Sequence, residues 1–305
     1  MSTFRTITKI LRSKPTMEGA GVRLKRVFGN NEVPLLDPFL LLDHFGSDNP
    51  DDYMAGFPWH PHRGIETVTY MLEGKVEHGD SIGNSGVIGS GDVQWMTAGG
   101  GIIHQEMPKR IEGMIQGFQL WVNLPASSKM MTPRYQEVKS DEIPIVELAN
   151  GTKVKVICGE VNGVRGPVRD IMADPEYLDV TIPAGEEFEH KVNDGYLVFA
   201  YVMQGSGMFG ASDQNTDSTS SGYAPTDRGS GGDAGTDVVT EEHLVIFGKE
   251  GSVKVNGGEG GIRFLLISGK PIGEPVAWYG PIVMNSKEDL ETAFREYREG
   301  TFIRS

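Results

Sequence analysis

The sequence predicts an all-β protein built from short antiparallel strands, and three observations support this fold class. Its 41 glycines and 17 prolines in 305 residues are typical of a chain with many turns. Short runs rich in β-branched and aromatic residues recur between Gly, Asn, Asp and Pro. A spacing pattern in the first half of the chain recurs in the second, which indicates two similar units. Together these features favour β-sandwiches or β-barrels.

The predicted strands are the runs in which apolar and β-branched residues cluster between turn residues. They span residues 5–11, 66–72, 93–97, 117–122, 154–158, 196–203, 243–247 and 263–267. The first of these lies in a basic segment without acidic residues before Glu18, a composition found in transit peptides. It lacks the apolar core of a secretory signal, so we interpret it as a strand of the mature protein.

One helix is expected, at residues 286–298 near the end of the chain. Ser286 and Asp289 are spaced as in a capping box. Leu290, Ala293 and Phe294 fall on one helical face, together with Tyr297. This pattern predicts a terminal helix packed on a sheet.

The segment 213–237 is almost entirely Ser, Thr, Gly, Asp and Asn, with Tyr223 as its only large apolar residue. Such a segment cannot bury enough surface to offset the entropy lost on ordering. We therefore predict a disordered loop inserted between two strands.

The net charge of −14 makes direct binding to nucleic acid unfavourable, because such a surface repels phosphates. Cys158 is the single cysteine and lies in an apolar alternation, which predicts a buried core thiol. No apolar run reaches the length that a membrane span needs. We expect a protein of the reducing cytosol, or also of the nucleus if the source is eukaryotic.

Two short motifs suggest a metal site. His60 and His62 are separated by one residue, as are His104 and Glu106. On a strand, residues i and i+2 project from the same face, so each pair can point into the interior of a barrel. The long separation between the pairs excludes a compact zinc-finger loop. Four potential ligands in two such pairs favour metal binding over isolated core or surface histidines.

The predicted ligand set has three imidazoles and one carboxylate. Such donors suit Fe(II), Mn(II), Ni(II), Cu(II) or Zn(II), and suit Ca(II) poorly. Without thiolates, the site does not have the composition of a structural zinc site. A metal that prefers six ligands would keep two positions for water, substrate or dioxygen.

Other polar and aromatic residues near these motifs carry weaker signals. Arg63 could orient a substrate anion or form an ion pair, and the glycines 99–101 are expected to form a turn and no phosphate loop. We expect structural or exposed roles for His44, His78 and His243, and either a pocket wall or core packing for Phe57, Trp59 and Trp95.

Four long segments resemble the pirin family: residues 57–70 (FPWHPHRGIETVTY), 91–108 (GDVQWMTAGGGIIHQEMP), 117–125 (GFQLWVNLP) and 274–285 (EPVAWYGPIVMN). The first two are similar to the two cupin motifs as pirins carry them. The resemblance covers nearly the whole chain and departs in the Ser/Gly-rich insertion.

The resemblance implies a bicupin, with two stacked antiparallel β-barrels of the jelly-roll type. We expect a metal-binding domain over residues 1–145 and a metal-free domain over 146–305. The ligands of the family fall on His60, His62, His104 and Glu106, with Fe(II) as the expected ion. Glu66, at a position used as a ligand by many other cupins, is expected to lie beside the site or to be a plain strand residue.

The second copy of the repeat explains why that domain should be metal-free. Gly185, His190, Val192 and Gly205 repeat the spacing of Gly56, His60, His62 and Gly74 to within a residue. Valine replaces the second histidine, and Leu197 stands where the acid would fall. His190 would then be a relic of a lost site.

Several pirins are similar in activity to quercetin 2,3-dioxygenases, which open the heterocyclic ring of a flavonol with dioxygen and release carbon monoxide. This resemblance implies a flavonol-like substrate, with Glu106 as the catalytic base. Eukaryotic pirins also resemble iron-dependent redox-sensing transcriptional coregulators, and bacterial relatives resemble metabolic regulators that act through a protein partner. A sugar or small-acid isomerase of the cupin type is a third possibility, and it would not need dioxygen.

Overall fold

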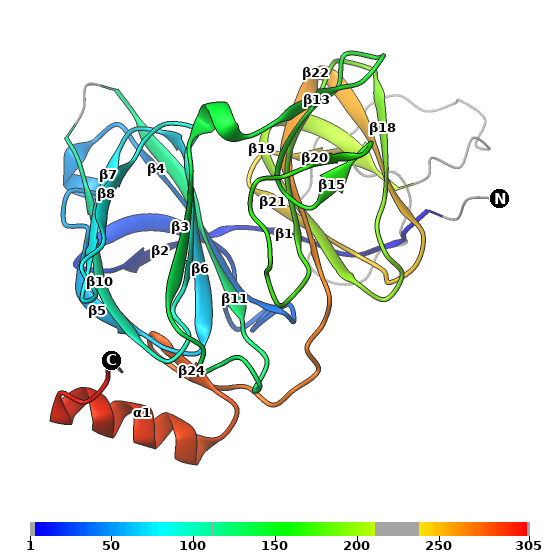
Figure 1. Cartoon of the computed structure of the whole chain (residues 1–305). Coiled ribbons are helices and arrows are strands. Elements are labelled where there is room, and N and C mark those ends of the chain that lie inside the picture. Colours follow the sequence, from blue (N-terminus) through cyan, green and yellow to red (C-terminus); the bar gives the residue numbers. More distant parts are fainter. Residues whose placement is uncertain (1–3, 111–112, 211–237, 304–305) are drawn as a thin grey trace.

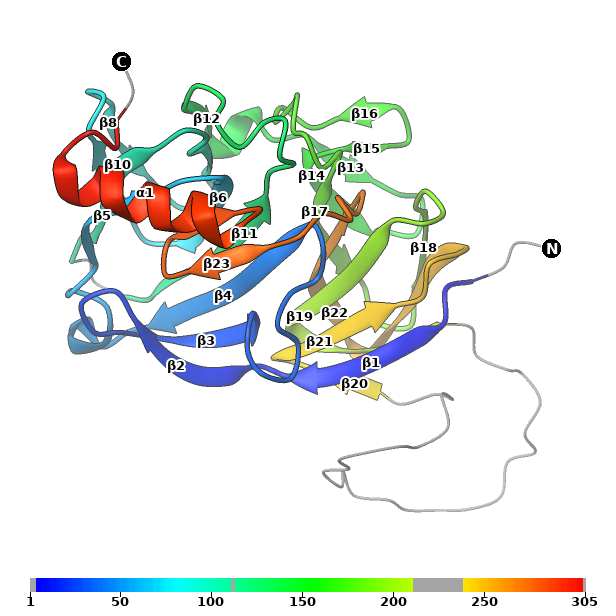
Figure 2. The same ribbon diagram turned by 90° about the horizontal axis from the view of Figure 1, so that it is seen from below.

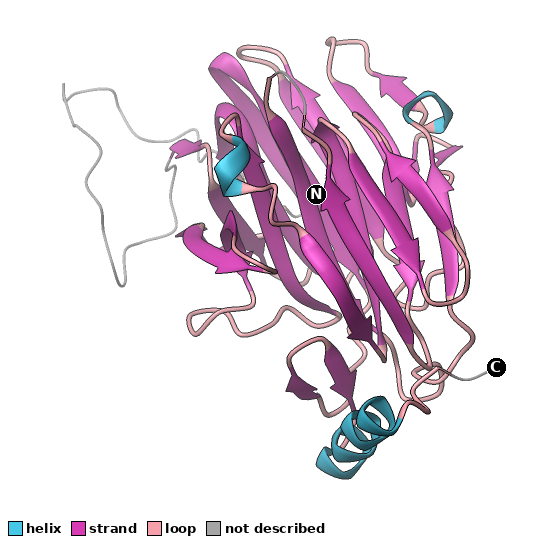
Figure 3. Cartoon of the chain, turned by 90° about the vertical axis from the view of Figure 1, so that its left-hand side faces the viewer, coloured by secondary structure: helices cyan, strands magenta, loops and turns pink. Residues whose placement is uncertain are grey.

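The computed structural model describes residues 4–110, 113–210 and 238–303, and it confirms an all-β fold with one terminal α-helix (Figure 1). The predicted disordered loop at 213–237 lies outside the described residues. The strands of both units lie in layers, and the helical segments are confined to the periphery (Figure 3).

The first unit consists of two antiparallel sheets. The larger sheet has the order β12 (Arg134–Val138), β9 (Val93–Thr97), β6 (Ile65–Glu73), β11 (Ile115–Asn123), β4 (Phe39–Ser47), β3 (Val22–Phe28) and β2 (Lys14–Glu18). The smaller has the order β5 (Phe57–His62), β10 (Ile102–Pro108), β7 (Val76–Asp80) and β8 (Ser85–Ile88). Side chains from both sheets line one cavity, so the sheets face each other across it.

The second unit is built around a single large sheet. Its main path is β1 (Ile7–Arg12), β21 (His243–Phe247), β19 (Leu197–Phe209), β22 (Ser252–Gly269), β17 (Glu176–Ile182), β14 (Lys153–Cys158) and β13 (Ile145–Glu147). β18 (Glu187–Lys191) pairs with β22, and β20 (Val238–Thr240) pairs with β19. The jelly-roll prediction is confirmed, with open sheets in place of closed barrels.

The remaining elements are short. They are the 3-10 helices Pro50–Asp52 and Ser140–Glu142, the hairpin of β15 (Glu160–Val161) and β16 (Val164–Arg165), the hairpin of β23 (Ala277–Tyr279) and β24 (Ile282–Met284), and α1 (Lys287–Glu299). No helix in the described part of the chain has the length and apolar character needed to cross a bilayer.

The terminal helix forms as its sequence pattern predicts. The Oγ atom of Ser286 accepts a hydrogen bond from the backbone N–H of Asp289 at 3.1 Å and so caps the first turn. Gly300 ends the helix in a left-handed conformation that glycine adopts at little cost. Ala293 is buried in a small apolar cluster with Ile282, next to the partly buried Leu290 and Phe294 on the same helical face.

Each end of the chain packs against the opposite unit. β1 pairs with β21 in the sheet of the second unit. The C-terminal segment returns to the first unit, where Arg63 forms an isolated bridge with Ile282, and Figure 2 shows α1 lying beside β5 and β10. The predicted domain division at residues 145/146 stays a prediction. The N-terminal strand β1 pairs with the second unit, and the C-terminal segment packs on the first.

An extended apolar core joins the two units. It includes Tyr70 and Trp95 from the first unit and Tyr177 and Phe199 from the second. Cys158 belongs to the same core, as the sequence predicts, and its burial raises the pKa of the thiol to about 12. This shared core fixes the first unit, and the cavity it contains, against the second.

Candidate metal centre

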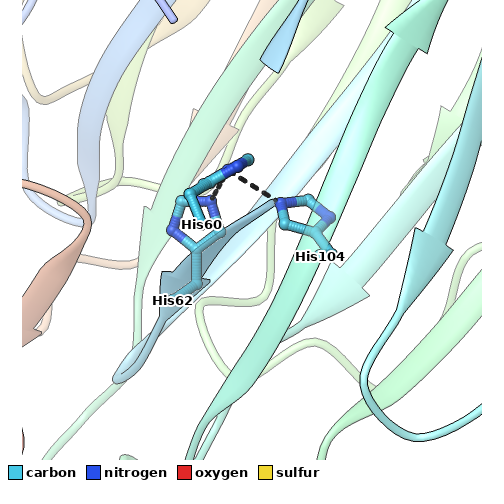
Figure 4. Close-up of side chains that lie close together, drawn as sticks. All are labelled: His60, His62 and His104. Atoms are coloured by element: carbon cyan, nitrogen blue, oxygen red, sulfur yellow. Dashed lines mark hydrogen bonds between the residues drawn. The ribbon is translucent and has the colours of Figure 1, made fainter. Parts of the chain in front are cut away.

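Three histidine side chains converge between β5 and β10. His60 and His104 are directly paired across the two strands, and His62 follows on the same face of β5. The Nε2 atom of His60 lies 3.0 Å from the Nε2 atoms of both His62 and His104 (Figure 4). One ligand atom of each histidine lies within 4.8 Å of the others, which places three potential ligands around one point.

Backbone carbonyls orient two of the rings. The Nδ1 atom of His60 lies 2.8 Å from the carbonyl oxygen of Pro58, and Nδ1 of His62 lies 3.1 Å from that of Pro281. A carbonyl only accepts, so each Nδ1 carries the hydrogen and each Nε2 of the neutral ring carries a lone pair. Two lone pairs therefore face each other across 3.0 Å, an arrangement that a shared cation stabilises.

The electrostatic environment also favours a bound cation. Burial lowers the pKa of all three histidines, so the rings are neutral and available as ligands. Two nitrogens about 2.1 Å from one ion, and at right angles to each other, lie roughly 3.0 Å apart. The separations of His60 Nε2 from His62 Nε2 and from His104 Nε2 match this geometry. The residues present therefore fit a divalent metal.

Glu106, the fourth predicted ligand, is not in the group of side chains whose ligand atoms all lie within 4.8 Å of one another. Its Oε1 atom accepts a hydrogen bond from the hydroxyl of Thr69 at 2.8 Å, and its Oε2 atom lies 3.4 Å from the amide nitrogen of Gln119. The side chain is buried, which raises the pKa of the carboxyl group, while the bond from Thr69 acts in the opposite direction. Glu106 lines the same cavity as His60 and His62. Its role as a ligand stays a prediction.

A cavity of about 760 Å³ opens beside the histidines. This volume lies within the range of pockets that hold drug-sized molecules. Phe57 and Trp59 contribute to its wall, whereas Trp95 packs into the core between the units. The other aromatic residues of the wall are Phe45, Tyr53, Trp121, Trp278 and Tyr279. The cavity therefore suits an apolar aromatic ligand.

The C-terminal segment forms one wall of this site, a feature that sequence patterns did not indicate. Residues 278–281 line the cavity, and the carbonyl of Pro281 orients His62. Arg63, which follows His62, is fully buried and donates to the carboxylate of Glu296 at 2.6 Å and to the carbonyl of Phe302 at 2.8 Å. Of the two roles considered for Arg63, the structure shows the ion pair.

Lys129 is a second anchor of the C-terminal segment. Its ammonium group is buried and donates to the carbonyl oxygens of Gly64 and Val283 and to the amide oxygen of Asn123. Burial lowers the pKa of the Lys129 ammonium to about 8. The bond to Gly64 holds the chain two residues after His62, so this lysine acts on the site through the backbone.

The remaining candidates have structural positions. Glu66 accepts a hydrogen bond from Thr97 at 2.7 Å and lies on the face of β6 opposite to Thr69, because the two are three residues apart on a strand. His44 is buried against Tyr201, and His243 bonds to nearby backbone carbonyls. His78 is buried and lies 2.7 Å from the carboxylate of Glu137.

Two further predictions concern the glycine run and the second unit. Residues 99–101 form a turn, in which the N–H of Gly101 donates to the carbonyl of Ala98. His190 lies 3.1 Å from the carboxylate of Glu176. Val192 belongs to the apolar cluster of the second unit, at the position that the repeat relates to His62.

Comparison with known proteins gives matches along most of the chain. The family model described as Pirin matches residues 21–122, and the model of the pirin C-terminal cupin domain matches residues 177–303. A pirin-like protein from Caulobacter vibrioides is 43% identical over 299 residues, which cover 98% of this chain and 99% of the relative. A Pseudomonas aeruginosa protein provisionally named a quercetin 2,3-dioxygenase is 42% identical over 304 residues. This match covers 98% of this chain and 99% of the relative.

A solved structure agrees with these sequence matches. The crystal structure of a quercetin 2,3-dioxygenase from Acinetobacter baumannii has a TM-score of 0.83 and 30% sequence identity to this chain. The match covers 98% of this chain and 99% of that one.

Proposed function

The chain belongs to the pirin family, and from this membership we propose that it is a metal-dependent dioxygenase that opens flavonols such as quercetin. Fe(II) is the ion we propose, with Mn, Ni, Cu and Zn as alternatives that the same donors accept. We further propose that His60, His62, His104 and Glu106 are its ligands, in an N-terminal domain of a cytosolic protein.

One observation carries the proposal: a largely apolar, aromatic-walled cavity opens directly on the histidine cluster. Its volume of about 760 Å³ leaves room for a flat, three-ring molecule with its edge toward the histidines. A site that acted only as a redox sensor would not need this space. The cavity therefore favours an enzyme that turns over a small aromatic substrate over a regulator that acts by binding a partner protein.

The residues around the cavity have separable roles in this reaction. A divalent ion held by the histidines would supply Lewis-acid chemistry, which would lower the pKa of a substrate hydroxyl group. The aromatic wall binds the substrate rings and excludes water. The carboxylate of Glu106 accepts the hydroxyl proton, and its raised pKa suits a general base. In a ligand role, Glu106 would use Oε2, because Oε1 accepts the hydrogen bond from Thr69.

The experiment that tests the proposal is oxygen uptake with quercetin, using protein reconstituted anaerobically with Fe(II). We expect uptake to track the loss of quercetin and to fall at least about 100-fold in His60→Ala, because one of the three converging ligands is lost. His190→Ala, at the related position of the second unit, is the matched control and should keep its activity and metal content.

Failure of the proposal has a clear signature. If the metal-loaded wild-type protein consumes no oxygen with quercetin, the dioxygenase assignment is wrong for that metal. The competing regulator hypothesis then predicts that a partner protein binds the ferric and ferrous forms with different affinities.

Thr69→Val is expected to lower kcat about 10-fold, because it removes the hydroxyl that orients Glu106 while conserving shape. Thr69→Ser, which retains a hydroxyl group, should recover most of the activity. Steady-state oxygen uptake at saturating quercetin measures the effect.

Thr67→Val provides the matched control for this prediction. Thr67 is buried on the same face of β6, two residues away, and should tolerate the change. Equal losses in Thr67→Val and Thr69→Val would contradict a specific role for the Thr69 hydroxyl.

A further inference from the structure

The cavity has a second polar end, formed by Arg26, Asp43 and Glu18. The guanidinium of Arg26 donates to both carboxylate oxygens of Asp43, at 2.7 and 2.8 Å, and to Glu18 at 2.8 Å. The Asp43 side chain is 7% exposed and that of Arg26 is 17% exposed, so both lie in the wall with little access to bulk water. We call these three residues the distal cluster.

Strand register places the distal cluster away from the histidines. Thr69, Gln119, Asp43 and Arg26 are consecutive cross-strand partners on β6, β11, β4 and β3. Neighbouring strands lie about 4.8 Å apart, so Arg26 stands three spacings, or roughly 14 Å, from Thr69 along the sheet. Thr69 contacts Glu106 beside the metal centre. Gln119 lies between Thr69 and Asp43 in this row, and the apolar wall residues Leu24, Leu41 and Phe45 flank the distal cluster along β3 and β4.

The charge of the distal cluster determines which ligand groups it accepts. It holds two carboxylates and one guanidinium, so acceptor oxygens are in excess and the net charge is negative. Carboxylates accept hydrogen bonds and cannot donate them. A neutral ligand with hydroxyl donors is therefore favoured at this end, and a carboxylate or phosphate group is repelled.

We propose that the distal cluster is a subsite for the phenolic hydroxyl groups of the substrate ring that lies farthest from the histidines. This inference rests on the proposed function, because it assigns an orientation within the same cavity. It narrows the substrate class to neutral polyphenols that carry hydroxyl groups at both ends. Flavonols without hydroxyls on the distal ring, and flavonols with an acidic substituent there, are poor ligands.

The test is anaerobic binding, measured by quenching of tryptophan fluorescence on metal-loaded protein. The probes are quercetin, which has two hydroxyls on its pendant ring, and galangin, which has none there but shares the other three hydroxyls of quercetin. The wild type is expected to bind quercetin about 10-fold more tightly, the size expected for hydrogen bonds to charged groups. In Asp43→Asn this ratio should fall toward one, while the affinity for galangin is unchanged.

Preserved affinity for galangin also shows that the variant is folded. Should Asp43→Asn not fold, Glu18→Gln replaces it, because Glu18 is more exposed, and it should reduce the ratio in the same direction. Equal affinity of the wild type for the two flavonols would overturn the subsite. An equal loss of affinity for both flavonols in a folded variant would overturn it as well.

Binding and turnover separate this inference from the proposed function. Oxygen uptake without discrimination between the two flavonols overturns the subsite and leaves the dioxygenase intact. Discrimination without oxygen uptake supports the polyphenol subsite and overturns the dioxygenase.

Discussion

Replacing Gly64 with alanine is expected to lower the free energy of unfolding by about 3–5 kcal/mol and to weaken metal binding by at least about 10-fold. Gly64 has a φ of +76°, a conformation that disfavours side chains. A Cβ atom there would lie 1.9 Å from the carbonyl oxygen of Val283, which is far inside van der Waals contact. The backbone of β24 must therefore move.

That movement would reach the metal centre through three contacts of the C-terminal segment. The N–H of Val283 donates to the carbonyl of Arg63 at 3.0 Å, and Lys129 donates to the carbonyls of Val283 and Gly64. Two residues before Val283, the carbonyl of Pro281 orients His62. Chemical denaturation measures the loss of stability, and calorimetric titration with Fe(II) under anaerobic conditions measures the loss of affinity.

Gly185→Ala is the matched control, because Gly185 has a similar φ of +71° and no atom within 4 Å of the added Cβ. Gly185→Ala should lower the free energy of unfolding by about 1 kcal/mol, because alanine there meets only the strain of the left-handed conformation. If Gly64→Ala costs no more than Gly185→Ala, then close packing of the C-terminal segment is not what requires glycine at position 64.

Local periodicity predicted the histidine cluster, because its geometry depends on neighbours along a strand. His60 and His62 share one face of β5, and His104 on β10 pairs directly with His60. The position of Glu106 could not be obtained in this way. The register between β5 and β10 shifts after His104, so that Glu106 pairs with Phe57, and no residue type in the sequence signals that shift.

Strand limits were predictable where apolar residues alternate up to a turn. β9 and β21 have the predicted bounds, whereas β22 extends from Ser252 to Gly269 and includes the run Gly257–Gly261. Pairs of adjacent glycines normally mark a turn. Here Gly257 and Gly258 come so close to neighbouring backbone that a Cβ would be crowded, and pairing with β19 continues past an irregular register. Contacts between distant segments decide such cases.

Contacts between distant segments also determine the C-terminal wall of the site, so local sequence patterns could not predict it. Residues 274–285 resembled a family motif, but their physical role became visible only from the fold. The contacts of Arg63 with Glu296 and Phe302 join residues more than two hundred positions apart. Charge and spacing near His62 do not reveal such a partner, because the ion pair is created by the return of the chain.

Asp179→Asn is expected to destabilise the protein by roughly 2–4 kcal/mol. The Asp179 side chain is 2% exposed and accepts hydrogen bonds from Arg263 at 2.9 and 2.6 Å. It also accepts the hydroxyl of Tyr70 at 2.7 Å, which links the two units through their shared core. Asparagine offers one acceptor in place of two, so a buried donor loses its partner.

The expected loss is below that of a fully buried ion pair because the Arg263 side chain is 35% exposed and can regain water. Glu160→Gln is the matched control: Glu160 pairs with Arg165 at 2.6 Å, but both side chains are exposed, so the cost should stay below about 1 kcal/mol. Denaturant midpoints and slopes measure both variants.

A double-mutant cycle of Asp179→Asn with Tyr70→Phe should give a coupling of about 1 kcal/mol or more, because the Tyr70 hydroxyl donates to the same carboxylate. Additive effects in this cycle would show that the hydroxyl and the carboxylate act independently, and that packing alone joins the units at this point.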